Sequence, residues 1–145
     1  MCPHEAINLR WSIQLGRHTL RTWSSTQRTV AMSSAEAEYN ALIDGVQRGF
    51  GVQTMLAELG VEVEVVMYTD SSAAKSFASQ RGLSRMRHMD VRKLWLQEEV
   101  RQGKVKLIKV RGDTNPADLM TKYLGSKEVD ERCAYLGIEV VKADD

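Results

Sequence analysis

The stretch from Ser33 to Leu59 constrains the fold of this chain more than any other part of the sequence. Ser33 and Glu36 have the S-x-x-E spacing of a capping box, which provides hydrogen-bond partners for the first free N–H groups of a helix. At the other end, Gly60 is a natural helix stop. Apolar side chains recur near helical spacing at Tyr39, Leu42, Ile43, Val46, Phe50, Leu56 and Leu59. The pattern predicts one long helix from about Ser33 to Leu59.

Three glycines, Gly45, Gly49 and Gly51, interrupt the middle of this predicted helix. Each costs about 1 kcal/mol of helix stability relative to alanine. Their presence therefore indicates either a bend or a place where another element packs closely.

Strand-like segments lie on both sides of the helix. Residues 7–15 and 18–26 are rich in β-branched and aromatic side chains, and Gly16 between them predicts a tight hairpin turn. Residues 62–70 are apolar on one face and partly apolar on the other, which is typical of a central strand. A further strand is predicted at 104–110.

Shorter helices are predicted at 71–79 and 88–101, after Asn115–Pro116, and at about 126–136. The apolar face of the segment 88–101 is predicted to carry Val91, Leu94, Trp95 and Val100. Strands linked by helices predict an α/β fold, and the opening hairpin makes the sheet mixed.

The composition is that of a globular protein. The chain has 145 residues, 43% of them hydrophobic, which suits one domain. A net charge of +1 does not by itself indicate nucleic-acid binding. No segment has the pattern of a membrane span or a signal peptide, so we expect an intracellular protein, cytoplasmic or nuclear. Cys2 and Cys133 form no CxxC pair, which argues against a zinc site or a disulfide framework.

Three carboxylates occupy positions where α/β proteins build sites. Glu38 lies in the early turns of the long helix, Asp70 ends the strand 62–70, and Asp118 begins a later helix. Carboxylate oxygens suit Mg²⁺ or Mn²⁺. Structural uses stay open at this point, because an acid at a helix start favours the helix dipole and an aspartate after a strand also forms turns. For Glu36 the capping use is favoured.

Four blocks of sequence resemble the ribonuclease H region of Ty/copia-type LTR-retrotransposon polyproteins. They are QRTVAMSSAEAEYNAL, MYTDSSAA, RHMDVRKLWLQEEV and GDTNPADLMTK, in that order, and the similarity covers roughly residues 20–125. The resemblance implies a ribonuclease H-like mixed β-sheet flanked by helices over residues 1–125, followed by a helical, polar tail at 126–145. It also implies a hydrolase, an endonuclease dependent on Mg²⁺ or Mn²⁺ that cuts the RNA strand of RNA–DNA hybrids. The reverse transcriptase and integrase regions of the parent polyprotein are the expected partners.

The resemblance also assigns residues. Glu38 matches the helix glutamate of the family's metal site, Asp70 the strand-end aspartate and Asp118 the late aspartate. The family's first strand, with its catalytic aspartate, would precede residues 7–15, but Glu5 is the acid found there and it matches no aspartate motif. We therefore expect an N-terminally truncated domain with its first strand missing, or a degenerate copy, and little cleavage. The alternative is a remnant that binds nucleic acid without cutting it.

A basic cluster begins before the third block and continues into it. Arg81, Arg85, Arg87, Arg92 and Lys93 fall within thirteen residues and are opposed only by Asp90. Such a cluster is typical of either a solvated face or a surface that contacts phosphates, and the resemblance favours contact with the hybrid backbone. Ser71 is a further candidate for nucleic-acid contact, although a helix N-cap is its favoured role.

Overall fold

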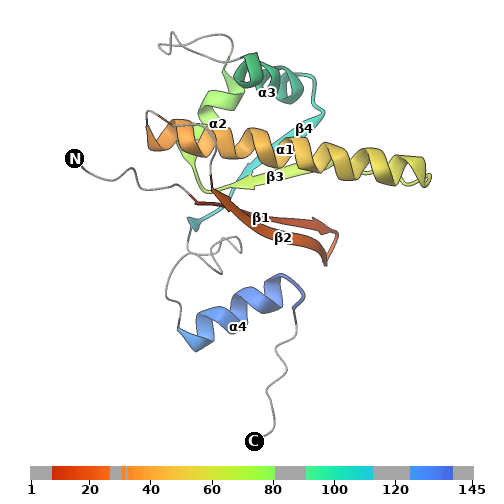
Figure 1. The fold of residues 1–145 in the computed structure, drawn as a ribbon, viewed down its shortest axis with the longest axis vertical. Helices are drawn as coiled ribbons and strands as arrows, with labels where there is room; N and C mark the ends of the chain where they lie inside the picture. The colour runs from red at the N-terminus through yellow and green to blue at the C-terminus, as the bar shows by residue number, and fades with distance from the viewer. Residues whose placement is uncertain (1–7, 27–30, 32, 81–90, 113–124, 139–145) are drawn as a thin grey trace, which may run out of the picture. The chain divides into compact units, whose positions relative to one another are not determined.

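The computed structural model describes residues 8–26, 31, 33–80, 91–112 and 125–138. The chain divides into two compact units. One combines Met1–Thr26 with Arg111–Asp145, and the other is Gln27–Val110. Figure 1 shows the elements of both units, which are described separately below.

The first unit contains the predicted hairpin. Strands β1 (Asn8–Leu15) and β2 (His18–Thr26) pair antiparallel, with Trp11 opposite Trp23. The two-residue turn between them is possible because Gly16 adopts a positive φ of 60°. The register shifts between Ile13 and Gln14, which is a β-bulge. The hairpin prediction is therefore confirmed.

Helix α4 (Ser126–Tyr135) belongs to the same unit and confirms the helix predicted at about 126–136. The carboxylate of Glu128 accepts a hydrogen bond from the Gly125 backbone N–H at 3.1 Å, which satisfies a free donor at the helix start. Just after the helix, the Leu136 carbonyl accepts a hydrogen bond from the Thr19 hydroxyl at 2.5 Å. This contact attaches the end of α4 to the hairpin.

The second unit is organised by helix α1 (Ser34–Glu58). The Ser33 hydroxyl accepts a hydrogen bond from the Glu36 N–H at 3.1 Å, so the predicted N-cap is confirmed. Gly60 has a φ of 78°, the left-handed conformation that ends a helix. The long helix lies where its capping residues and its apolar spacing predict it.

Two parallel strands pack with three helices in this unit. Strand β3 (Val65–Thr69) pairs with β4 (Val105–Lys109), and helices α2 (Ser72–Ser79) and α3 (Val91–Arg101) lie between them in the sequence. The buried core consists of Tyr39, Leu42, Ile43, Val46, Ala74, Ala78, Leu96 and Val105. The α/β class is thus confirmed, with small antiparallel and parallel sheets rather than one mixed sheet in the described part of the chain.

The strand predicted at 62–70 needs a correction. Its described part is shorter, and among the described residues it pairs with β4 alone rather than lying in the centre of a sheet. Val66 and Tyr68 on its outer face are 37% and 55% exposed, whereas a central strand buries both faces. The partly apolar outer face was the reason for the central assignment, and in this structure it stays open to solvent.

The buried face of α3 agrees with the prediction only in part, since Trp95 and Val100 pack against the core. Val91 is 77% exposed and Leu94 is exposed, while Lys93, Leu96 and Gln97 are buried. Two polar residues can face inward because their polar groups are bonded there, as when the Gln97 side-chain amide donates to the Phe77 carbonyl at 3.0 Å. None of the described helices has the length and apolarity required to cross a membrane.

Candidate functional site

Asp70 is held in place by the backbone on both sides of it. Thr69, the residue just before Asp70, accepts a hydrogen bond on its carbonyl from the Val110 N–H at 2.9 Å. The Ser71 N–H donates to the buried Thr69 hydroxyl at 3.1 Å, and the Ser71 hydroxyl accepts from the Ala74 N–H at the start of α2. Asp70 itself is exposed. The end of β3 therefore presents a carboxylate to solvent from a fixed stretch of backbone.

Ser71 has the structural role that the sequence favoured. Its hydroxyl caps α2 by accepting a hydrogen bond from the Ala74 N–H at 3.1 Å. That role is confirmed, whereas contact between Ser71 and nucleic acid stays a prediction.

Glu38 lies in the second turn of α1, exposed between two buried neighbours, Ala37 and Tyr39. Tyr39 is 2% exposed, and its hydroxyl donates to the Lys93 carbonyl at 2.6 Å. Burial raises the pKa of the Tyr39 hydroxyl, so the group stays protonated and remains a donor. The turn that carries Glu38 is thereby attached to the start of α3.

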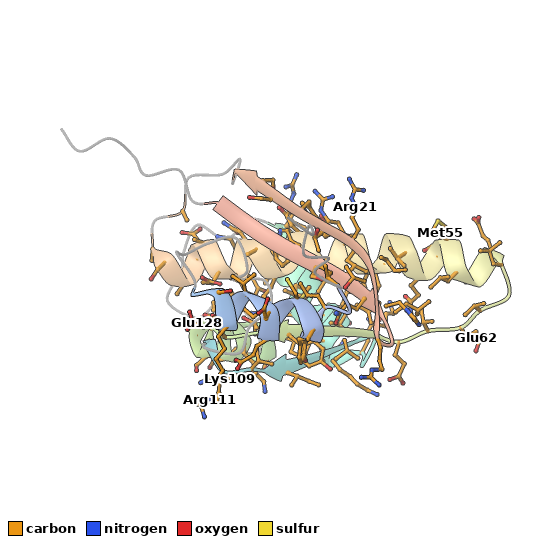
Figure 2. The ribbon with its side chains drawn as sticks, turned by 90° about the horizontal axis from the view of Figure 1, so that it is seen from below. Arg21, Met55, Glu62, Lys109, Arg111 and Glu128 are labelled. Carbon is orange, nitrogen blue, oxygen red and sulfur yellow. The ribbon has the colours of Figure 1, made fainter. Side chains whose placement is uncertain are left out.

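Helix α1 runs antiparallel to β3, as Figure 1 shows. Late in the helix, the Gln53 side-chain amide donates to the Val63 carbonyl at 2.6 Å. Figure 2 shows Met55 near that end of α1 and Glu62 in the segment that turns back toward β3. Early in the helix, the Tyr39 ring meets the edge of the Phe77 ring of α2, with centroids 4.6 Å apart. The first turns of α1 therefore lie at the end of the unit where β3 finishes.

Gly49 is a point of close packing between the helix and the strand. A Cβ atom at this position would lie 3.0 Å from the Val65 Cγ1 atom, so the Val65 side chain packs directly against the backbone of α1 here. From Gly49 back to Glu38 the helix covers about 16 Å, and from Val65 on to Asp70 the strand also covers about 16 Å. Both carboxylates thus lie at a similar level, at the same end of the unit.

Glu38 also lies on the side of α1 that meets β3. Glu38 and Gly49 are eleven positions apart, which is about three helical turns, so the two positions share a face to within about 20°. Glu36 lies about 160° away from Glu38 around the helix axis. Its carboxylate forms an ion pair with the Lys93 ammonium of α3. The two glutamates of the EAEY segment therefore face different elements, and Glu38 is the one on the side of β3.

Two residues of the basic cluster, Arg92 and Lys93, lie within the described part of the chain. Arg92 is exposed in the first turn of α3, where it is open to a ligand. Lys93, by contrast, has a side chain that is 9% exposed, and its ammonium is bound to Glu36, whose side chain is 16% exposed. The sequence pattern missed this ion pair. The signal was present, because Lys93 stands at helical spacing from Leu96 and Val100 on one face of α3.

The remaining predicted site residues, Asp118, Arg81, Arg85 and Arg87, lie outside the described residues. Within the described ranges, no group of three or more His, Cys, Asp or Glu side chains forms a cluster that could hold a metal ion. The structure thus brings Glu38 and Asp70 to one end of the second unit, and a complete ligand set stays a prediction.

The chain is similar in sequence to retrovirus-related Pol polyproteins from plant transposons. It is 36% identical over 104 residues to the polyprotein from transposon TNT 1-94 of Nicotiana tabacum, a match that covers 70% of this chain. For the polyproteins from transposons RE1 and RE2 of Arabidopsis thaliana, the identities are 26% over 129 residues and 28% over 115 residues, covering 87% and 77% of the chain.

The matches cover 8% or 9% of the length of these relatives, so the chain corresponds to a small part of each polyprotein. No family model and no solved structure matches the chain. These similarities confirm that the chain is related to retrotransposon Pol polyproteins, whereas its assignment to the ribonuclease H region stays a prediction.

Proposed function

We propose that this chain is the ribonuclease H region of a Ty/copia-type retrotransposon Pol polyprotein, a region that cuts the RNA strand of RNA–DNA hybrids when the first aspartate of its site is also present. The observation that carries the proposal is the antiparallel packing of α1 on β3, which brings Glu38 and Asp70 to the same end of the unit. Similarity to retrovirus-related Pol polyproteins from transposons supports it, and so does the resemblance of the four sequence blocks, which implies this activity.

The donor chemistry of the two described carboxylates suits Mg²⁺ or Mn²⁺, since these cations prefer carboxylate oxygens. Glu38 and Asp70, with Asp118 as the third ligand, would hold the metal. When bound, such ions lower the pKa of the attacking water and stabilise the leaving 3′-oxygen. The chain's own contribution is orientation, because the hydrogen bonds of Thr69 and Ser71 hold the backbone at Asp70 while packing against β3 directs Glu38.

The substrate would lie beside α3, with Arg92 and the segment containing Arg81, Arg85 and Arg87 contacting phosphates. Lys93 is left out of this surface because its ammonium already pairs with Glu36. The reverse transcriptase and integrase regions of a parent polyprotein are the proposed neighbours.

A metal-dependent melting experiment tests the site. Carboxylates that face one another repel unless a cation compensates, so Mg²⁺ or Mn²⁺ should raise the melting temperature of the chain. Asp70→Asn and Glu38→Gln should remove that rise, and without metal these variants should be as stable as the parent or more so. Asp44→Asn is the matched control, because Asp44 is an exposed acid on another part of α1. An equal metal-induced rise in Asp70→Asn would contradict the site.

A cleavage assay tests the activity. None of the residues 1–145 matches the first aspartate of the family, so a labelled RNA–DNA hybrid should be cut only when a strand bearing that aspartate is added before residue 1. Hybrid binding without cleavage by the extended chain would favour the alternative function, a module that binds nucleic acid without catalysis. Rapid metal-dependent cleavage by residues 1–145 would show that another acid takes this place.

A further inference from the structure

We propose that Lys93 is a positioning residue for Glu38. By pairing with Glu36, it sets the rotation of the first two turns of α1 about the helix axis, and it thereby directs Glu38 toward the end of β3. This inference rests on the proposed function, because it assigns Glu38 to the metal site. It also replaces the phosphate contact that the sequence suggested for Lys93.

Lys93 receives two contacts from neighbouring turns of α1. Its ammonium binds the Glu36 carboxylate, and its backbone carbonyl accepts a hydrogen bond from the Tyr39 hydroxyl at 2.6 Å. Glu36 and Tyr39 are three residues apart and thus lie on the same side of the helix. Both side chains of the ion pair are largely shielded from water, which limits screening of their attraction. One residue of α3 therefore contacts α1 at two successive positions.

These two contacts are directional, unlike the apolar contacts around them. Leu42, Ile43 and Val46 bury apolar surface, and that driving force depends little on orientation. A hydrogen bond or an ion pair weakens when its geometry changes. Farther along, Gly49 meets β3 about three turns away. The Lys93 contacts are thus placed to set the rotation of α1 at the end that carries Glu38.

The sensitivity of a metal site makes this rotation important. A carboxylate at the outer surface of a helix lies about 5–6 Å from the axis, so a 20° rotation moves it by about 2 Å. Mg²⁺ requires near-ideal geometry with ligand distances of about 2.0–2.1 Å. Because Glu36 and Glu38 lie on nearly opposite sides of α1, a contact that holds Glu36 against α3 also fixes the direction of Glu38.

Metal affinity measured on folded protein tests the proposal. Isothermal titration with Mn²⁺ would compare the parent chain with Lys93→Met, Glu36→Gln and the double variant, at a temperature where circular dichroism shows each to be folded. Each single change should weaken Mn²⁺ binding by about 10-fold or more, in the range found when groups that orient metal ligands are removed. The double variant should be no weaker than the single ones, since all three lack the same contact.

Arg92→Met is the matched control, because it removes an adjacent but exposed cation from the same helix turn. Its Mn²⁺ affinity should equal that of the parent. Should Lys93→Met fail to fold, Glu36→Gln provides the same comparison. A Lys93→Met protein that melts at a lower temperature yet binds Mn²⁺ normally would show that Lys93 only stabilises the fold, and would overturn the proposal. So would weaker hybrid binding with unchanged Mn²⁺ affinity.

A second measurement separates this inference from the proposed function. If the parent chain binds neither Mg²⁺ nor Mn²⁺, the proposed metal site fails, and amide hydrogen exchange then decides the role of Lys93. Faster amide exchange at Ala37–Ala41 in Lys93→Met, but not in Arg92→Met, would support the proposal that Lys93 fixes the rotation of these turns. Unchanged exchange there would overturn it.

Discussion

The contact between Gly49 and Val65 is the basis for placing Glu38 at the level of Asp70, and substitution of two glycines in α1 tests this contact. Gly49 and Gly51 stand two residues apart in the same helix, but their surroundings differ. A Cβ atom at position 49 would lie 3.0 Å from Val65 Cγ1, whereas one at position 51 would meet nothing within 4 Å. Alanine at either position should gain about 1 kcal/mol of helix propensity. Only the change at Gly49 should encounter a steric penalty.

The expected free energies of unfolding follow from these two effects. Gly51→Ala should stabilise the protein by about 0.5–1 kcal/mol. At Gly49 the same gain competes with overpacking against Val65, which typically costs about 1–3 kcal/mol. The two alanine variants should therefore differ by about 1–3 kcal/mol, with Gly49→Ala the less stable. Removing the obstructing methyl groups in Gly49→Ala/Val65→Ala should relieve part of the penalty, so the two changes should not be additive.

Urea unfolding followed by circular dichroism at 222 nm measures these differences, with equal m-values as the check that the variants unfold in the same way. The reasoning would be refuted if Gly49→Ala stabilised the protein as much as Gly51→Ala. In that case α1 would not approach β3 at this point, and the alignment of Glu38 with Asp70 would lose its basis.

Three further predictions concern the ends of the helices. Ser33→Ala removes the hydroxyl that caps α1 and should cost about 1 kcal/mol in urea unfolding. Hydrogen bonds, first from Arg101 and then from Gln102, lower the pKa of Glu98 from 4.5 to about 2. Their contribution to stability is present above about pH 4.5 and is lost as the pH falls toward 2, and Glu98→Gln should remove this dependence from an acid titration. Arg92→Ala should flatten the salt dependence of hybrid binding by about one unit of slope, whereas Arg101→Ala, at the other end of α3, should leave it unchanged.

Local signals were sufficient to predict several elements of the fold. The hairpin depends on Gly16 and its positive φ, and α1 depends on the Ser33 cap and on Gly60. These features act over a few residues, so they can be read from the sequence directly. The pairing of strands, by contrast, joins segments that are distant in the sequence. Apolar residues on both faces of a strand do not show which strands pair with it. The expectation of one mixed sheet therefore went beyond what the local pattern determines.

The candidate site shows the same division between local and distant information. The position of Asp70 after a strand and of Glu38 in an early helical turn follows from nearby residues, and their alignment depends on the distant contact of Gly49 with Val65. The glycines in α1 indicated close packing or a bend, and only the structure distinguishes Gly49, which packs closely, from Gly51, which does not.

Lys93 shows why charge pattern alone misassigns a residue. In the sequence it continues a run of cations, and a phosphate contact is the natural interpretation of such a run. In the structure its side chain lies on the buried side of α3. Its ammonium forms an ion pair with the carboxylate of Glu36, which is distant in the sequence. A partly buried lysine needs such a partner, because an isolated charge is costly to remove from water.

The capping-box spacing accounted for Glu36 locally, yet the structure shows that its carboxylate also binds α3 while its backbone N–H completes the cap. Glu36 thus serves both the start of its own helix and the contact with α3, and Glu38 lies on the opposite side of α1.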